Sequence, residues 1–275
     1  MATPIVLDEY KRAIAEHFDA RTDYSRSKTH ARLADRLVRL ATPQPDERVL
    51  DIATGTGFVA IPAARSVGER GTVVGVDIST GMLDKAREAI VAAGVGNIEL
   101  MQADAETLDY PAGSFDLIFC CNALPYMTDV PAALRLWHTL LRPGGRLAFN
   151  CWAEESYATG HLLRVVAARH GIRVAVVGRD TGTPERCRAV LAAAGFVRTE
   201  VVAEPTAAFF SVDQLEAIPE MAIKNPLYRI APGDASRLSD LLDAYTTDAQ
   251  SPAVRECIDV EVGAYFVLAH KLPAS

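Results

Sequence analysis

The 275-residue sequence contains no run of about 18 uninterrupted apolar residues, the length that a membrane-spanning helix requires. Its first residues lack a basic segment followed by an apolar one, so we expect no secretion signal. Positive charge is not in excess either, because 28 basic residues face 35 acidic ones and the net charge is -7. Such a balance does not favour binding to a phosphate backbone or to anionic lipid. These absences predict a cytoplasmic protein that binds neither nucleic acid nor a membrane.

Spacings typical of metal sites are also missing. The five cysteines are an odd number without CxxC spacing, and three of them stand in apolar runs typical of buried strands. We therefore expect reduced cysteines in the core. The sequence has no HxxxH pattern and no cluster of Asp and Asn residues, so we predict no metal site.

Hydrophobic residues make up 49% of the chain, enough to bury a sizeable core. Two helical patterns come first, and from Arg48 onward short apolar runs alternate with amphipathic stretches. This alternation predicts an α/β fold with a doubly wound, mostly parallel, Rossmann-like sheet. The expected helices are residues 6–20, 28–41, 58–67, 80–93 and 130–140, and the expected parallel strands are residues 48–53, 72–77, 97–102, 115–121 and 146–152.

After Trp152 the pattern changes, and we expect helices at residues 160–170 and 184–194. Strands at residues 196–203 and 264–270 would complete a sheet of seven strands. We expect one domain, made of a helical cap (1–45), a core (46–203 and 264–272) and a helical insertion (204–263). We predict that the insertion forms a lid over a ligand, because a structureless connection of that length would be unusual.

A candidate binding site stands at the first turn of the predicted sheet. The first strand runs into Thr54-Gly55-Thr56-Gly57 and then into a helix, so the two glycines lie where the chain turns sharply beneath a ligand. Open α/β sheets bind ligands beyond the carboxyl ends of their strands, where the strand order reverses. The first βα turn is that place.

Acidic residues stand at the ends of the first three predicted strands, at Asp51, Asp77 and Asp104. From its position Asp77 can accept hydrogen bonds from both hydroxyls of a ribose, and Asp104 can bind the amino edge of an adenine. Carboxylates would repel the pyrophosphate of a dinucleotide, whereas S-adenosylmethionine (SAM) carries an ammonium and a sulfonium. A dinucleotide fingerprint would also have glycine where Ala60 stands. The residues therefore favour SAM as cofactor.

Four segments now stand out together: DIATGTG, VDIS with Met82 following, ADAETLDYPAGSFDLI and LLRPGGRLAF. They resemble class I SAM-dependent methyltransferases of the group that contains the ubiquinone and menaquinone C-methyltransferases. The resemblance covers about residues 48–152, and beyond them the chain is similar only in outline. These families often have glycine where Ala53 stands, and we expect the extra methyl group to be tolerated.

The resemblance implies how the chain holds its cofactor. Related methyltransferases often present a tyrosine to the methionine end of SAM, which makes Tyr24 a candidate, although it could equally be an aromatic anchor of the cap. The resemblance further implies a methionine-side turn at Asp51, Ala53, Gly55 and Gly57, a ribose contact at Asp77, adenine contacts at Ile78, Met82, Asp104 and Ala105, and a floor at Asn122 and Leu124.

The favoured hypothesis is in-line methyl transfer from SAM to a small-molecule acceptor, with S-adenosylhomocysteine as the second product. Positioning under the lid would supply much of the catalysis. Of six histidines, His161 is the predicted general base, because its segment follows the fifth strand; the alternative is a histidine on a helix surface. Apolar and aromatic residues in the insertion suggest a hydrophobic acceptor, such as a secondary metabolite or a quinone-like molecule, unless they pack the insertion onto the core.

Three other functions stay open. A chain of this fold can bind SAM and catalyse a different reaction, such as a cyclisation, or it can be a non-catalytic, SAM-binding regulator. A nicotinamide-dependent dehydrogenase is the third. The sequence fixes neither the acceptor nor the atom methylated nor the oligomeric state, a homodimer included.

Overall fold

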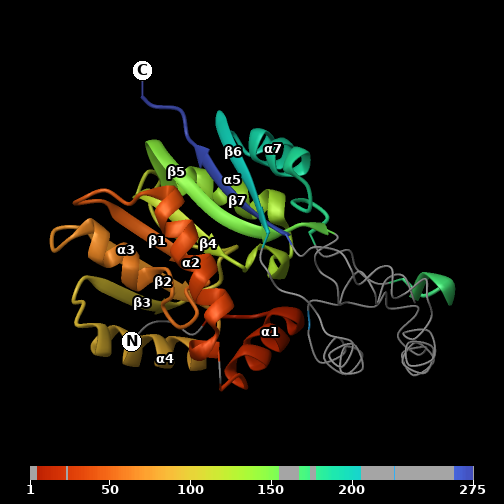
Figure 1. Cartoon of the computed structure of the whole chain (residues 1–275), viewed down its shortest axis with the longest axis horizontal. Coiled ribbons are helices and arrows are strands. Elements are labelled where there is room, and N and C mark those ends of the chain that lie inside the picture. Colours follow the sequence, from red (N-terminus) through yellow and green to blue (C-terminus); the bar gives the residue numbers. More distant parts are fainter. Residues whose placement is uncertain are drawn as a thin grey trace. The chain divides into compact units, whose positions relative to one another are not determined.

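The computed structural model describes residues 5–22, 24–154, 167–173, 178–205, 226 and 263–274. These residues form a seven-stranded sheet with the order β3-β2-β1-β4-β5-β7-β6 (Figure 1). The strands are β1 (Arg48–Ile52), β2 (Thr72–Asp77), β3 (Ile98–Gln102), β4 (Phe115–Cys121), β5 (Leu141–Trp152), β6 (Arg198–Pro205) and β7 (Gly263–His270). Strands β1 to β5 pair in parallel. The predicted doubly wound, mostly parallel α/β fold is confirmed.

The α-helices of the described chain alternate with the strands. They include α1 (Glu9–Asp19), α2 (Lys28–Ala41), α3 (Ala60–Val67), α4 (Thr80–Ala93), α5 (Val130–Leu140) and α7 (Pro184–Ala193), with short 3-10 helices η1 (Tyr24–Arg26) and η2 (Leu124–Tyr126). Most match the predicted ranges to within one or two residues. The segment 28–41 begins where predicted because the Ser27 side chain caps it and accepts a hydrogen bond from the His30 N–H.

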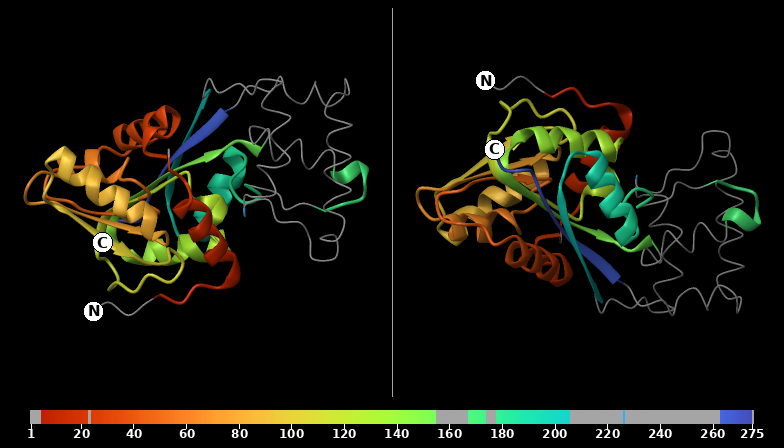
Figure 2. Two further views of the ribbon diagram at one scale, coloured as in Figure 1. Left: turned by 90° about the horizontal axis from the view of Figure 1, so that it is seen from below. Right: turned by 90° about the horizontal axis from the view of Figure 1, so that it is seen from above.

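The core lies around the central strands, whose residues are apolar on both faces because helices cover both sides of the sheet. Val49, Leu50 and Ile52 of β1 are fully buried, as are Leu117 and Phe119 of β4. The strand order reverses between these two strands. Right-handed crossovers therefore place α3 and α4 on one face and α5 on the other. Figure 2 shows α5 beside α7 on one side of the sheet and α2 on the other.

The segment Arg142-Pro143-Gly144-Gly145 differs from its prediction as a tight turn before a strand. Helix α5 does end at Leu140, but β5 already begins at Leu141, which pairs with Phe115. The next pairing joins Arg146 to Leu117, so the segment forms a bulge within the strand. Gly144 has a φ of +78°, which absorbs the extra residues of the bulge.

The described chain divides into two compact units, one of residues 1–151, 184–202 and 266–275 and one of residues 152–183 and 203–265. In the second unit the Glu154 N–H donates to the Gly182 carbonyl at 2.9 Å. The predicted lid at 204–263 lies almost wholly outside the described residues, and so does most of the predicted helix at 160–170. The expected division into cap, core and lid therefore stays a prediction. Within the described chain, no helix combines the length and apolar character that a membrane crossing requires.

Candidate functional site

The turn after β1 is held in an unusual backbone conformation. Ala53, Gly55 and Gly57 all have positive φ, at +53°, +56° and +87°. The buried carboxylate of Asp51 stabilises this turn, because it accepts a hydrogen bond from the Thr54 hydroxyl at 2.6 Å. The Thr54 N–H donates to the Val76 carbonyl at 2.9 Å, which ties the turn to β2. The left-handed conformation of Ala53 ends β1 one residue earlier than predicted.

Asp77 ends β2 and faces this turn. Its carboxylate accepts hydrogen bonds from the backbone N–H groups of Gly55 and Ser79, each at 2.9 Å. Burial raises the pKa of Asp77 to about 6, although these hydrogen bonds oppose the shift. Burial also raises the pKa of Asp51 to about 7, against the hydrogen bond from Thr54 and aided by the charge of Asp77. The two buried acids are poised to respond to a ligand that donates hydrogen bonds or brings positive charge.

A pocket of roughly 700 Å³, part of it open to solvent, lies over this turn within the first unit. Its lining includes most of the predicted cofactor residues, namely Tyr24, Ala53, Gly55, Asp77, Ile78, Met82, Asp104, Ala105 and Asn122. Asp51, Gly57 and Leu124 do not line it, and their contact with a cofactor stays a prediction. His161, the predicted general base, lies outside the described residues.

The lining also contains residues that sequence reasoning missed, which are Lys11, Ile14, Phe18, Ala103, Glu106, Cys121, Ala123, Tyr126 and Met127. Cys121 was within reach of the sequence, because it ends a predicted strand on the same side as Asp51 and Asp77. Lys11, Ile14 and Phe18 were not, because they come from α1, whose docking onto the sheet depends on contacts distant in sequence.

Helix α1 is fastened at both ends. Near its start, the Lys11 ammonium contacts the carboxylates of Asp104 at 2.5 Å and Glu106 at 2.9 Å. At its end, Asp19 accepts hydrogen bonds from the hydroxyl of Ser79, the N-cap of α4, at 2.6 Å and from the Gly81 N–H in the first turn of α4 at 2.9 Å. The helix thereby spans the adenine side of the predicted site.

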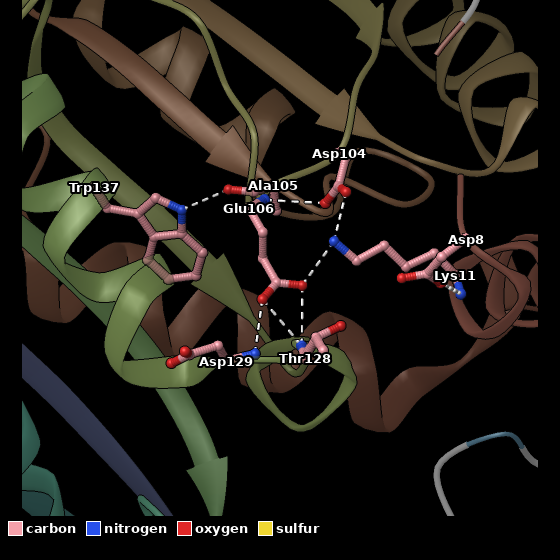
Figure 3. Close-up of polar contacts among 8 residues, drawn as sticks. All are labelled: Asp8, Lys11, Asp104, Ala105, Glu106, Thr128, Asp129 and Trp137. Atoms are coloured by element: carbon pink, nitrogen blue, oxygen red, sulfur yellow. Dashed lines mark hydrogen bonds and ion pairs between the residues drawn. The ribbon is translucent and has the colours of Figure 1, made fainter. Parts of the chain in front are cut away.

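Glu106 connects this fastening to the loop before α5, as Figure 3 shows. Its carboxylate accepts hydrogen bonds from the backbone N–H groups of Thr128 at 2.9 Å and Asp129 at 2.8 Å. Burial alone would raise the pKa of Glu106, but these bonds and the ammonium of Lys11 hold it below its usual value. Behind the loop, the Trp137 indole donates to the Ala105 carbonyl at 2.9 Å.

Aromatic side chains also line the pocket. Phe18 packs edge-on against Tyr126, with ring centroids 5.3 Å apart, and the Arg21 guanidinium lies 5.3 Å from the centre of the Tyr24 ring. Tyr24 borders the glycine turn, because a Cβ added to Gly55 would lie 3.7 Å from Tyr24 Cε1. Burial raises the pKa of the Tyr24 hydroxyl, so the phenol keeps its proton at neutral pH.

The floor after β4 depends on a pair of asparagines. Asn122 has a φ of +57°, a conformation that few residues other than glycine adopt. Its N–H donates to Asn150 Oδ1 at 3.0 Å, and Asn150 Nδ2 donates back to Asn122 Oδ1 at 2.5 Å. Asn150 is fully buried on β5. This exchange fixes the Asn122 side chain at the wall of the pocket.

Residues 49–145 match a family model described as a methyltransferase domain. The chain is 39% identical over 149 residues to aklanonic acid methyltransferase of Streptomyces sp. (strain C5), covering 51% of this chain and 66% of that protein. It is 32% identical over 187 residues to nocamycin O-methyltransferase of Saccharothrix syringae, covering 62% and 67%. The chain belongs to the class I SAM-dependent methyltransferases.

A third relative of this methyltransferase is the ubiquinone/menaquinone biosynthesis C-methyltransferase of Teredinibacter turnerae (strain ATCC 39867 / T7901), 38% identical over 136 residues, covering 49% of this chain and 55% of that protein. The resemblance drawn from the sequence motifs is confirmed, and the cofactor is SAM. The chain spans about half to two thirds of the length of these curated relatives.

Solved structures share the fold of this methyltransferase. The [4+2]-cyclase SpnF superposes with a TM-score of 0.56 at 20% identity, covering 89% of this chain and 81% of that one. Phosphoethanolamine N-methyltransferase 2 of Haemonchus contortus superposes with a TM-score of 0.58 at 17% identity, covering 99% and 62%. At these identities the likeness extends to the fold alone.

Proposed function

We propose that the chain transfers a methyl group from SAM to a small, hydrophobic organic acceptor and leaves S-adenosylhomocysteine. The observation that carries the proposal is the pocket at the carboxyl ends of the central strands, where the buried carboxylate of Asp77 meets the left-handed turn at Gly55. This is the switch point at which open α/β sheets bind ligands. Membership of the family supports the same cofactor there.

The groups around the pocket fit the groups of SAM. Asp77 is 8% exposed, and the hydroxyls of a ribose can supply hydrogen bonds that a buried, ionised carboxylate needs. Ile78 and Met82 offer apolar surface to an adenine, and Asp104 offers an acceptor to its amino group. Tyr24 borders the turn where the methionine end would lie. The lid at 204–263 would exclude water from this site.

Two observations support a hydrophobic, aromatic acceptor. Phe18, Tyr24 and Tyr126 give the pocket a wall of rings, which pack well against flat organic molecules. Two relatives carry names that refer to organic compounds, aklanonic acid and nocamycin. An aromatic or quinone-like metabolite with hydroxyl or carboxyl groups meets both conditions.

The charge state of the described pocket residues bears on how the acceptor loses its proton. SAM supplies an activated methyl group on a sulfonium, so the protein has to orient the acceptor and keep water out. Burial raises the pKa values of the Tyr24 hydroxyl and the Cys121 thiol, so neither is an effective base near pH 7. Unless His161 or another residue outside the described part of the chain fills that role, the acceptor must be acidic enough to ionise unaided, as phenols with electron-withdrawing substituents, enols of diketones and carboxylic acids are.

The test is S-adenosylhomocysteine formation by the purified protein with a panel of acceptors. The panel contains a hydroxyanthraquinone, an anthraquinone carboxylic acid and a naphthoquinol, and it sets them against the small polar amines glycine and phosphoethanolamine. We expect turnover with one or more of the aromatic acceptors and none with the amines.

Turnover with the amines alone would contradict the acceptor class, while methyl transfer itself would stand. Binding of SAM without product from any acceptor, together with rearrangement of a polyene substrate at unchanged mass, would instead favour the cyclisation alternative.

A further inference from the structure

Lys11 is a cation inside the candidate cofactor pocket. Its residue is 9% exposed, and it lines the pocket together with Asp104 and Glu106 (Figure 3). An ammonium carries three N–H donors. Two of them are used by Asp104 Oδ2 and Glu106 Oε2, and the third has no acceptor among the residues that the structure describes.

The ammonium of Lys11 keeps its charge in this setting. Burial alone would lower its pKa, but the hydrogen bonds and charges of Asp104 and Glu106 outweigh burial, and the pKa lies above its ordinary value. The pocket is partly open to solvent, and a hydrogen bond from a charged donor stabilises a complex more than one from a neutral donor. A ligand with an acceptor atom at this place would therefore bind better than one without.

Lys11 and Asp104 present opposite hydrogen-bonding roles side by side. Asp104 uses Oδ2 for Lys11 and Oδ1 for the Glu106 N–H at 3.0 Å, and a carboxylate has about four lone-pair positions, so acceptor capacity is left. The pair thus combines a carboxylate acceptor with an adjacent N–H donor. An adenine has the complementary arrangement, because its amino group donates and the ring nitrogens on either side of it accept.

The backbone around the pair is fixed, so the arrangement is set before a ligand arrives. Asp8 caps α1 and accepts a hydrogen bond from the Lys11 N–H at 2.8 Å, while Asp19 ties the other end of the helix to α4. Glu106 is held by two backbone N–H groups of the next loop. Preorganisation of this kind reduces the entropy lost on binding.

We propose that Lys11 and Asp104 together recognise the adenine of the cofactor, and that Lys11 does so by donating a hydrogen bond to a ring nitrogen beside the amino group. This inference rests on the proposed function, because it requires a SAM-type ligand in the pocket. Lys11 would then determine cofactor recognition in addition to anchoring α1 to the loop after β3. Lys11 lies outside residues 49–145, the segment that matches the family model, so the match itself does not point to this contact.

The test measures binding of S-adenosylhomocysteine and of its 1-deaza and 7-deaza analogues, in which CH replaces one ring nitrogen, to the wild-type protein and to K11M. We expect the wild type to bind one analogue roughly tenfold more weakly, the cost of a lost hydrogen bond to a charged donor. In K11M this penalty should vanish. A double-mutant cycle that combines the K11M substitution with the replacement of the ring nitrogen then isolates the coupling between the two groups.

The matched control is R12M, which removes a charge from the neighbouring position of the same helix. Arg12 is exposed, and its guanidinium donates only to the Leu7 carbonyl among the contacts described, at 3.2 Å, so its replacement should leave the penalty unchanged. If K11M does not fold, K11Q, which keeps a neutral N–H donor for Asp104, is measured with the same ligands and should reduce the penalty, because a neutral donor forms a weaker hydrogen bond than a charged one.

The outcomes separate the inference from the function on which it rests. An analogue penalty that is equal in wild type and K11M would overturn the inference, and it would assign the contact to the Ala105 backbone or another group. A wild type that binds both analogues as tightly as S-adenosylhomocysteine would overturn it as well and leave Lys11 with a purely structural role. If the wild type does not bind S-adenosylhomocysteine at all, the proposed function fails instead.

Discussion

At the scale of single residues, the turn after β1 places a non-glycine residue where glycine is favoured. Ala53 has a φ of +53°, and its Cβ lies close to its own carbonyl oxygen in this conformation, which costs about 1 kcal/mol. The sequence predicted a turn here and showed an alanine where related families often have glycine. It did not reveal that this residue adopts a left-handed backbone conformation. The extra methyl group is therefore accommodated with strain.

We expect A53G to raise the free energy of unfolding by up to about 1 kcal/mol, since glycine removes this strain but loses some entropy on folding. Denaturant unfolding measures the change. The control is G94A, because Gly94 has a similar φ of +65° and nothing lies within 4 Å of an added Cβ. G94A should lower the free energy of unfolding by about 1 kcal/mol. If A53G is less stable than wild type, the strain assigned to the conformation of Ala53 is contradicted.

The buried acids of the pocket give cofactor binding a pH dependence. In the free protein burial raises the pKa of Asp77 to about 6 and that of Asp51 to about 7, so both are partly protonated below neutral pH. A ligand that donates hydrogen bonds to Asp77 favours its ionised form and lowers its pKa, and positive charge on the ligand lowers the pKa of Asp51, which does not line the pocket. Binding therefore releases protons, and affinity increases as pH rises through this window.

We expect SAM affinity to increase roughly tenfold between about pH 5 and pH 7, as one pKa unit of linkage implies. Calorimetric titration near pH 6.5, in two buffers with different ionisation enthalpies, should record proton release. D77N should release fewer protons than wild type. Affinity that is flat across this range, or proton uptake, would show that neither acid senses the ligand.

The residues that the sequence identified share one property. Asp77, Asp104 and Gly55 stand at the carboxyl ends of strands whose apolar runs are plain, so the sheet rule places them together. Lys11 and Asn150 have no such signal. Lys11 reaches the pocket through the docking of α1, and Asn150 lies within a strand where an apolar residue is expected. Contacts distant in sequence decide both, and no local spacing encodes them.

At the scale of elements, α1 joins the pocket through charges of opposite sign. Lys11 binds the loop after β3, and Asp19 binds the start of α4, where the helix dipole favours a negative charge. The amphipathic pattern predicted the helix but not its docking. The bulge in β5 is a second case, because a Pro-Gly-Gly segment is equally compatible with a turn and with a bulged strand.

We expect D19A to destabilise the protein by about 1 kcal/mol, because the Ser79 hydroxyl and the Gly81 N–H lose their acceptor, and to weaken S-adenosylhomocysteine binding because α1 lines the pocket. Thermal unfolding and calorimetric titration measure the two effects. D35A is the control: Asp35 pairs with Arg39 on the exposed face of α2, where an ion pair contributes little. Affinity lost equally in D19A and D35A would argue against a specific role for α1.

At the scale of the whole chain, the alternation of apolar runs and amphipathic stretches was sufficient to predict the sheet. β2 and β4 span the predicted residues, because buried parallel strands are apolar on both faces and easily recognised. The same reasoning placed the pocket at the switch point between β1 and β4. This reasoning does not identify the acceptor, because the aromatic wall consists of residues of α1, η1 and η2 that no sequence motif connects.

The measurement that tests the central claim most directly is calorimetric titration of SAM and S-adenosylhomocysteine into wild type, D77N and D116N. Asp116 is buried on β4 and accepts a hydrogen bond from the Arg48 N–H at 2.6 Å, but it does not line the pocket, so it controls for loss of a strand carboxylate. We predict micromolar binding of both ligands to wild type and D116N, and at least about tenfold weaker binding to D77N, since charge-assisted hydrogen bonds are lost. Failure of both ligands to bind the wild type, or undiminished binding to D77N, would contradict the assignment of this pocket to SAM.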